Sequence, residues 1–358
     1  MMPIIVIKTI NRCNSNCIYC FSEKDKQLNR ISLATIKDLF FRILEYLQRD
    51  SERRIEIQWH GGEPLLLGAE FYQKIALLQN SVLGKYQENI EHTMQSNLTL
   101  LNQPILNALL LLKVKSVGTS VDPISGIRGI GKYIDSKIYL KKFLRGISFL
   151  ESIKINWGIN YVVTKNSLKI PKEIFYFLTN VSLFKPIVFN PVKGMTSSAD
   201  KLKITPRQYT SFLADIYSIM KVNNGLNGCI EPIHSMELAA DKIFHNTAIE
   251  EKAQEIPVVL DGKGNFYYYR IPDNPLGNIY QNNFSTILIK NEYINASIID
   301  REKDIRNCLK CVLWNVCIAN TINDPFSQNE EFKNLEWCYA RKKFVLDFLL
   351  DQKKDKNG

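Results

Sequence analysis

The sequence predicts an α/β fold of about six parallel β–α units, followed by a smaller α+β region. Two observations predict it. Apolar, β-branched segments alternate with longer amphipathic segments up to about residue 195, which is typical of parallel βαβ units. That alternation then stops, and a hairpin pattern and a second group of cysteines follow. Six units are fewer than the eight of a closed barrel, so we expect an incomplete one.

The elements follow from local periodicity. Strands are expected where apolar residues cluster or alternate, at 3–10, 55–59, 91–96, 117–121, 155–163 and 186–189. Helices are expected where apolar residues recur at helical spacing, at 33–48 (with Ser32 as N-cap), 69–81, 103–112, 137–150 and 171–179. Beyond them we expect a linker at 196–203, helices at 206–221 and 230–246, a hairpin at 256–269 and a closing helix at 337–351. Asp261-Gly262 is a strong tight-turn signal for that hairpin.

Composition excludes several classes of protein. The chain has 358 residues, 45% of them apolar, with 17 glycines and 13 prolines, which indicates a globular protein of one large and one smaller domain. Its longest apolar runs, such as 105–112, are too short to span a bilayer, and the N-terminus lacks the basic region of a signal peptide. We therefore expect a cytoplasmic protein without a membrane partner.

The formal net charge is +10, and the lysines are dispersed. No Lys/Arg stripe is interleaved with aromatic residues, so we expect no nucleic-acid partner. A basic balance favours an acidic partner through long-range steering, although a lysine-rich solvated surface without any partner explains the charge as well.

Three cysteines share one short loop after the first expected strand. Cys13, Cys17 and Cys20 have C-x3-C-x2-C spacing. Three thiolates can hold three corners of a cubane iron–sulfur cluster and leave the fourth iron open. Half of a zinc site and three unrelated buried thiols are the alternatives. Seven of the eight cysteines fall in two clusters of a chain without a secretory signal, which favours metal or redox use over disulfides.

This loop resembles that of the radical S-adenosylmethionine (SAM) superfamily. The resemblance implies an enzyme with a partial (β/α)6 barrel and a [4Fe–4S] cluster whose open iron chelates the amino and carboxylate groups of SAM. One electron then cleaves SAM to a 5′-deoxyadenosyl radical. Tyr19 stands where the family carries an aromatic residue that approaches the adenine.

Further segments resemble SAM-binding motifs of the same family. Gly61-Gly62-Glu63-Pro64 resembles the motif that accepts hydrogen bonds from the methionyl ammonium, with glycines that let the backbone approach the ligand. Ser120 and Arg128 match positions that contact the ribose and the SAM carboxylate, although the family usually has a longer stretch between them. The resemblance also implies that Asn97 lines the site and that Val192 packs on the adenine; an ordinary core valine explains Val192 equally well.

The second cysteine group is Cys308, Cys311 and Cys317, followed by Cys338. It resembles the C-terminal extension of the SPASM subgroup (named for its peptide and sulfatase maturases), where such cysteines bind the outer auxiliary iron–sulfur cluster. A structural zinc site is the alternative. The subgroup has a further cysteine where this chain has Thr321, and others along the hairpin, whereas this chain has none between Cys229 and Cys308. We therefore expect one auxiliary [4Fe–4S] cluster and no inner one.

Four regions are expected. They are a radical SAM partial barrel (1–195), a helical linker region (196–255), a SPASM-like auxiliary-cluster domain (256–350) and a flexible tail (351–358). Only twelve residues precede Cys13, which leaves no room for an N-terminal peptide-recognition domain. Leader binding is then expected from the barrel mouth, the C-terminal domain or a separate leader-recognition protein.

The resemblance implies a maturase that removes a hydrogen from a side-chain carbon of a ribosomally made precursor peptide and forms an intrapeptide cross-link, with a C–C bond of the cyclophane type preferred. The alternatives are an anaerobic sulfatase (formylglycine) maturase, a peptide epimerase, a thioether former, or an inactive iron–sulfur partner that binds peptide. Flavodoxin or ferredoxin is the expected electron donor. The general base is not identified; Glu231 and His234 are weak candidates, and Cys229 is either a buried spare thiol or a hydrogen donor.

Overall fold

The computed structural model describes eleven segments of the chain. They are residues 2–20, 28–131, 134–153, 155–182, 185–192, 196–223, 230–247, 257–268, 271–294, 311–313 and 336–357. Several residues singled out from the sequence lie outside them, namely Cys229, Tyr269, Cys308, Cys317 and Thr321.

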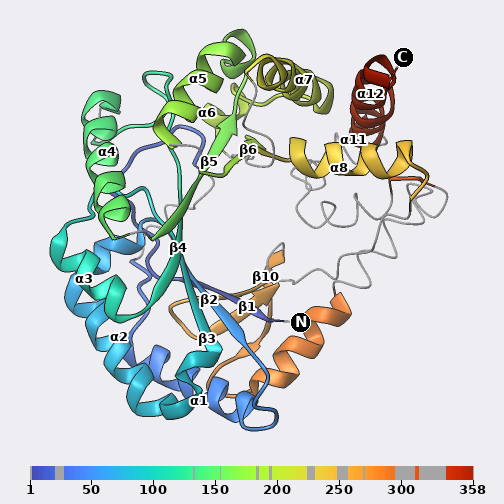
Figure 1. Ribbon diagram of the computed structural model, residues 1–358. Coiled ribbons are helices and arrows are strands. Elements are labelled where there is room, and N and C mark those ends of the chain that lie inside the picture. Colours follow the sequence, from blue (N-terminus) through green and yellow to red (C-terminus); the bar gives the residue numbers. More distant parts are fainter. Residues whose placement is uncertain are drawn as a thin grey trace.

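The first half of the chain is an open ring of parallel strands with helices on its outer side (Figure 1). The strands are β1 (Ile4–Lys8), β2 (Ile55–His60), β3 (Ile90–Gln95), β4 (Val114–Thr119), β5 (Asn156–Val163) and β6 (Ile187–Pro191). The helices between them are α1 (Leu33–Leu47), α2 (Gly68–Leu83), α3 (Gln103–Leu111), α4 (Ser136–Ser152) and α5 (Pro171–Ser182). Short 3-10 turns add η1 (Pro64–Leu67), η2 (Gly84–Asn89) and η3 (Ser167–Lys169). The predicted partial (β/α)6 barrel is confirmed.

Sequence periodicity explains how these layers pack. Ser32 caps α1 by accepting a hydrogen bond from the Thr35 N–H, as predicted. In β2, Ile55, Ile57 and Trp59 are buried, whereas the alternate residues are only partly buried. Trp59 meets Tyr72 of α2 edge to face, with ring centroids 5.7 Å apart. Successive side chains of a strand point to opposite faces, so the buried set faces the helices and the polar set faces the inside of the ring.

The sheet continues at both ends beyond the six β–α units. Its strand order is β10-β9-β8-β1-β2-β3-β4-β5-β6-β7. At one end, β7 (Ile230–Glu231) pairs in parallel with β6. At the other, β8 (Val258–Leu260) pairs in parallel with β1 and forms the predicted hairpin with β9 (Asn265–Tyr268), next to β10 (Ile271–Asn278). The hairpin therefore extends the barrel sheet, because the wholly buried apolar strand β8 covers the edge of β1.

Helices follow the sixth strand. They are the short α6 (Ser197–Asp200), α7 (Pro206–Val222) and α8 (Ile233–Phe244). Thr205 and Gln208 form a capping box at the start of α7. The segment predicted as a plain linker thus contains α6, and both helices predicted after it are present.

The chain ends in a helical segment that was only partly predicted. It runs from α11 (Glu336–Lys342) through a π-helical stretch (Lys343–Leu349) into α12 (Leu350–Asn357). Residues 351–358 were expected to form a flexible tail, whereas the structure continues the helix to Asn357. Lys353 forms an ion pair with Asp241 of α8, a contact between residues distant in sequence that local patterns do not predict. In the described part of the chain, no helix has the length and apolar character needed to cross a bilayer.

Candidate functional site

The cysteine loop leaves the C-terminal end of β1 and is fixed by the segment that follows β4. The backbone N–H of Asn16 donates to the Gly129 carbonyl (2.8 Å), and that of Ile18 donates to the Ile127 carbonyl (3.0 Å). Arg128 lies between these two acceptors. Because function collects at the C-terminal ends of parallel strands, two segments far apart in sequence meet where a site is expected.

The three thiols of this loop influence one another electrostatically. Burial raises the pKa of Cys13 to about 11, and the charges of Glu63, Cys17 and Cys20 add to the increase. Burial also raises the pKa of Cys17, against the lowering effect of Arg128. Burial therefore disfavours the thiolate forms of both cysteines. Bound iron would favour them, because metal coordination deprotonates a thiol outright.

This donor set fits a cluster better than a single ion. Within the described residues, no three His, Cys, Asp or Glu side chains lie close enough to share one metal ion. A cubane places each of three thiolates on a different iron, and therefore needs thiols around a loop instead of a tight trio. Cys13, Cys17 and Cys20 are spread over one loop in the sequence, and none of them is in a disulfide.

The two glycines after β2 are required by packing against the cysteine loop. A Cβ on Gly62 would lie 2.2 Å from the Arg12 carbonyl oxygen, and one on Gly61 would lie 2.6 Å from that of Ile10. Gly61 also has a φ of 132°, a conformation that side-chain-bearing residues avoid. The Gly62 N–H donates to Ile10 (2.6 Å). The sequence predicted that these glycines let the backbone approach a ligand. In the structure they also let it approach the segment that leads into Cys13.

Glu63 links the turn after β2 to the turn after β3. Its side chain is 1% exposed. One carboxylate oxygen accepts from the Ser96 hydroxyl (2.7 Å) and the Leu65 N–H (3.0 Å), and the other accepts from the Asn97 N–H (2.7 Å). Burial raises the pKa of Glu63 to about 7, and these three donors oppose that increase. Glu63 therefore fixes the turn.

Asn97 joins that turn to the cysteine loop. Its Nδ2 amide donates to Asn14 Oδ1 (2.9 Å) and Ser15 Oγ (3.1 Å), and lies 3.6 Å from Cys13 Sγ. Its Oδ1 accepts from the Thr99 N–H (2.9 Å) and hydroxyl (2.7 Å). Asn14 in turn donates to the Thr99 hydroxyl at 2.7 Å. Sequence reasoning missed Asn14 and Thr99, although both flank predicted site residues.

Arg128 is held between two tyrosines. Its Nε and Nη2 donate to the Tyr19 hydroxyl (3.1 and 2.9 Å), and its Nη1 donates to the Tyr139 hydroxyl (3.3 Å). The Tyr139 hydroxyl donates to the Ser120 carbonyl at 2.7 Å. Three residues predicted to contact SAM, Tyr19, Ser120 and Arg128, are thus brought together. Tyr139 was missed because it occupies an apolar position of an amphipathic helix and looks like an ordinary core residue.

Tyr19 also belongs to a small apolar cluster that is separate from the main core. Its other buried members are Ile127, Val192 and Leu202. Tyr19 and Val192, the two residues predicted to approach the adenine, therefore lie in the same cluster. An apolar surface of this kind suits one face of an aromatic base.

Asp122 has one buried carboxylate oxygen without a partner in the described part of the chain. The other oxygen accepts from the Ile124 N–H at 2.9 Å. Burial raises the pKa of Asp122 to about 7, and Arg128 opposes this. Buried acceptors are normally satisfied, so an orphaned one at the end of β4 fits a ligand that carries hydroxyl or ammonium donors, as SAM does.

The remaining predicted site residues are less connected. Glu231 accepts from the Ser235 hydroxyl (2.7 Å) at the start of α8, and His234 lies in the first turn of that helix. No contact recorded among the described residues joins either of them to the cysteine loop. Of the second cysteine group, Cys311 packs against the main core and Cys338 lies on α11, while Cys308 and Cys317 are outside the described residues.

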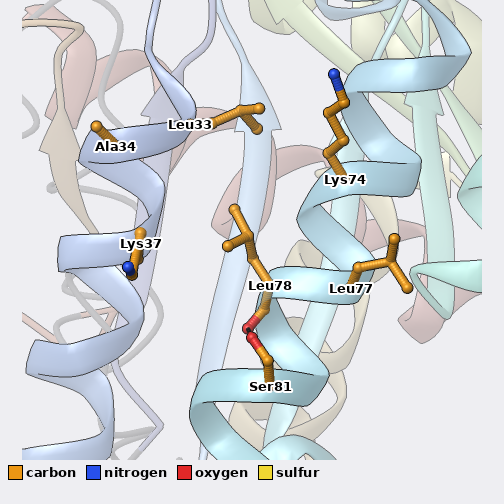
Figure 2. A pocket seen from close by; sticks show the side chains of 7 residues that line it. All are labelled: Leu33, Ala34, Lys37, Lys74, Leu77, Leu78 and Ser81. Atoms are coloured by element: carbon orange, nitrogen blue, oxygen red, sulfur yellow. Dashed lines mark hydrogen bonds between the residues drawn. The ribbon is translucent and has the colours of Figure 1, made fainter.

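A groove on the outer side of the barrel lies between α1 and α2 (Figure 2). It is lined by Leu33, Ala34, Lys37, Lys74, Leu77, Leu78 and Ser81. None of these residues belongs to the cysteine loop or to the predicted SAM contacts, so the groove is separate from the site.

Comparisons with known proteins agree with this geometry. Residues 7–173 match the model of the radical SAM superfamily. An uncharacterized protein, MJ0907 of Methanocaldococcus jannaschii, is 31% identical over 63% of this chain and 71% of its own length. The cysteine-type anaerobic sulfatase-maturating enzyme of Clostridium perfringens (strain 13) is 23% identical over 96% of this chain and 95% of its own.

A solved structure shares the fold over nearly the whole chain. The native anSMEcpe with bound AdoMet and Kp18Cys peptide superimposes with a TM-score of 0.74 at 19% identity, and covers 99% of both chains. The family match spans the cysteine loop, the Gly-Gly-Glu-Pro turn and the Arg128 segment, so the resemblance seen in the sequence is confirmed. The chain belongs to the radical SAM superfamily and is an enzyme that uses SAM with a [4Fe–4S] cluster.

Proposed function

We propose that the chain is a peptide maturase of the SPASM subgroup that forms a cross-link within a ribosomally made precursor peptide, with a C–C bond of the cyclophane type preferred. The observation that carries the proposal is the assembly of the cysteine loop, the Glu63–Asn97 turn and the Tyr19–Val192 cluster at one end of an open barrel. A structural neighbour holds AdoMet and a peptide together, which supports a peptide as the substrate.

When bound, SAM and the cluster would supply a 5′-deoxyadenosyl radical. The protein's residues bind and orient. Cys13, Cys17 and Cys20 would hold three irons, while Tyr19 and Val192 would cover the adenine and exclude water. Ser120 would hold the ribose, and Arg128 would face the methionyl carboxylate, since its fork matches carboxylate geometry. Gly61, Gly62 and Pro64 would shape the turn that receives the ammonium.

Ring closure is an oxidation of the peptide by two hydrogens. One would leave as a hydrogen atom to the deoxyadenosyl group, and the other would leave as a proton when the new bond forms. One electron remains and needs an acceptor. Cys308, Cys311, Cys317 and Cys338 would hold an auxiliary [4Fe–4S] cluster, which would supply such an acceptor. Flavodoxin or ferredoxin would supply the electron that starts each cycle, and a separate protein would assist leader recognition.

Formylglycine formation on a sulfatase is the second candidate. The near full-length likeness to the Clostridium perfringens enzyme favours it. The absence of any cysteine between Cys229 and Cys308 opposes it, because the inner auxiliary cluster of those maturases would have no ligands there.

Co-expression with a short candidate precursor peptide, sought among the neighbouring genes, separates these functions. A cross-link predicts a loss of two hydrogens and no reaction of the product with hydroxylamine. Formylglycine made from serine also loses two hydrogens, but its aldehyde reacts with hydroxylamine. An unchanged mass with a D-residue that disappears in Cys229→Ala would indicate an epimerase instead. Failure of the reduced protein to release 5′-deoxyadenosine would indicate an inactive peptide-binding partner.

A further inference from the structure

The side-chain amide of Asn97 lies against the sulfur of Cys13. The distance from Asn97 Nδ2 to Cys13 Sγ is 3.6 Å, and the backbone N–H of Ser15 donates to the same sulfur at 3.3 Å. Hydrogen bonds to cluster sulfurs are one of the means by which proteins set the reduction potential of iron–sulfur clusters. Asn97 therefore lies where it would act on the cluster through Cys13, in addition to its expected place in the SAM site.

The orientation of this amide is fixed by its neighbours. Two donors of Thr99, the backbone N–H and the hydroxyl, reach Asn97 Oδ1. Because an N–H pair cannot accept them, Nδ2 must face the cysteine loop. The Asn97 backbone is held independently by the Glu63 carboxylate. Asn97 is 7% exposed, and a buried dipole acts more strongly on a nearby charge than one in water.

We propose that Asn97 is a positioning residue of the radical SAM cluster, and that its amide raises the reduction potential by directing its N–H dipole at the Cys13 thiolate, with two hydrogens that Asn14, Ser15 and Cys13 share. One-electron reduction adds negative charge that spreads over the thiolate sulfurs. The N–H dipole stabilises that added charge and makes the reduced cluster easier to form. Asn97 thus acts on the step that precedes SAM cleavage.

The test is an EPR-monitored redox titration of the full, anaerobically reconstituted protein without SAM and without peptide. Asn97→Leu removes the donor without adding a charge and is expected to shift the midpoint potential of this cluster to a more negative value. Asn97→Asp keeps an acceptor for Thr99, loses the donor and is expected to shift the potential the same way. Asn102→Leu is the matched control, because it makes the same change in the same segment between β3 and α3, where Asn102 caps α3 by accepting from the Ile105 N–H; its potential should equal that of the wild type.

Three results would overturn the proposal. The first is an unchanged potential in an Asn97→Leu protein with full iron content. The second is an equal shift in Asn102→Leu, which would trace the effect to packing of the segment. The third is failure of both Asn97 variants to take up iron while Asn102→Leu is fully loaded, which would leave Asn97 a purely structural role. None of these results bears on the peptide substrate, since the titration contains none.

Discussion

The carboxylate of Glu63, just after β2, accepts a 2.7 Å hydrogen bond from the backbone N–H of Asn97, just after β3. Through Asn97 the same network reaches Asn14, Ser15 and Cys13. The Gly-Gly-Glu-Pro turn, which was predicted to contact the cofactor, therefore also stabilises the cysteine loop. Changes in the Gly-Gly-Glu-Pro turn should therefore affect iron binding as well as SAM binding.

Glu63→Gln should weaken both the fold and SAM binding. The glutamine would present an NH2 group to donors that now meet carboxylate oxygens, and at least one buried donor would lose its acceptor. Such a loss costs about 1–3 kcal/mol. Urea unfolding and equilibrium dialysis with SAM measure the two effects. Glu70→Gln is the control, because Glu70 forms an exposed pair with Lys74 on α2, and its loss should leave the free energy of unfolding nearly unchanged. Equal behaviour of the two variants would refute the bracing role.

Gly62→Ala should lose iron. The added Cβ would meet the Arg12 carbonyl at 2.2 Å, so the segment leading into Cys13 would have to move. Iron content and the visible absorbance of the reconstituted protein report the loss. Gly84→Ala tests whether any glycine replacement has this effect: Gly84 has a positive φ of 50°, but no atom lies within 4 Å of an added Cβ. It should cost about 1–2 kcal/mol of stability and keep its iron.

Arg128→Lys should weaken SAM binding at least about tenfold, because an ammonium cannot reproduce the guanidinium fork that spans Tyr19, Tyr139 and a carboxylate. Isothermal titration of the anaerobic protein with SAM measures this. Arg145→Lys, on the outer helix α4, should bind SAM like the wild type. Unchanged affinity in Arg128→Lys would remove this residue from the site.

Acid should destabilise the fold through His92. This histidine is buried and accepts from Trp59 Nε1 (3.2 Å), while its Nε2 lies 2.6 Å from Gln79 Oε1. Burial lowers the pKa of His92 from 6.5 to about 3. Between about pH 3 and pH 6.5, the unfolded chain therefore binds a proton at His92 that the folded chain does not bind. The contribution to stability is fully present above pH 6.5 and falls by about 1.4 kcal/mol per pH unit below it, until about pH 3.

Glu63 and Asp122 have raised pKa values, so their contribution to the free energy of unfolding increases as the pH falls, opposite to that of His92. The test therefore compares the wild type with a His92 variant at each pH. The gap in unfolding midpoint between wild type and His92→Gln should narrow from pH 7.5 to pH 5.5. A constant gap for His92→Gln would show that His92 is not held neutral.

The sequence predicted most of what local patterns determine. Strong periodicity located the six strands of the barrel, and the Ser32 cap began α1 where expected. The pairing of β8 with β1 was not predictable, because it consists of three residue pairs and about 250 residues of chain separate the two strands. Tyr139 and Thr99 were missed for a related reason. Tyr139 is linked to Tyr19 through Arg128, and Thr99 accepts a hydrogen bond from Asn14. Tyr19 and Asn14 are distant in sequence, and neither a tyrosine nor a threonine stands out in its own segment.

The central claim is that Cys13, Cys17 and Cys20 hold a cluster with one open iron that binds and cleaves SAM. The most direct measurement is the release of 5′-deoxyadenosine from SAM by dithionite-reduced, anaerobically reconstituted protein, compared with the Cys13→Ala, Cys17→Ala, Cys20→Ala triple variant. The account predicts release by the wild type, none by the triple variant, and an EPR signal of the reduced cluster that changes when SAM is added. Zinc in place of iron at these cysteines, or an iron-loaded protein whose EPR signal ignores SAM and which releases no 5′-deoxyadenosine, would contradict it.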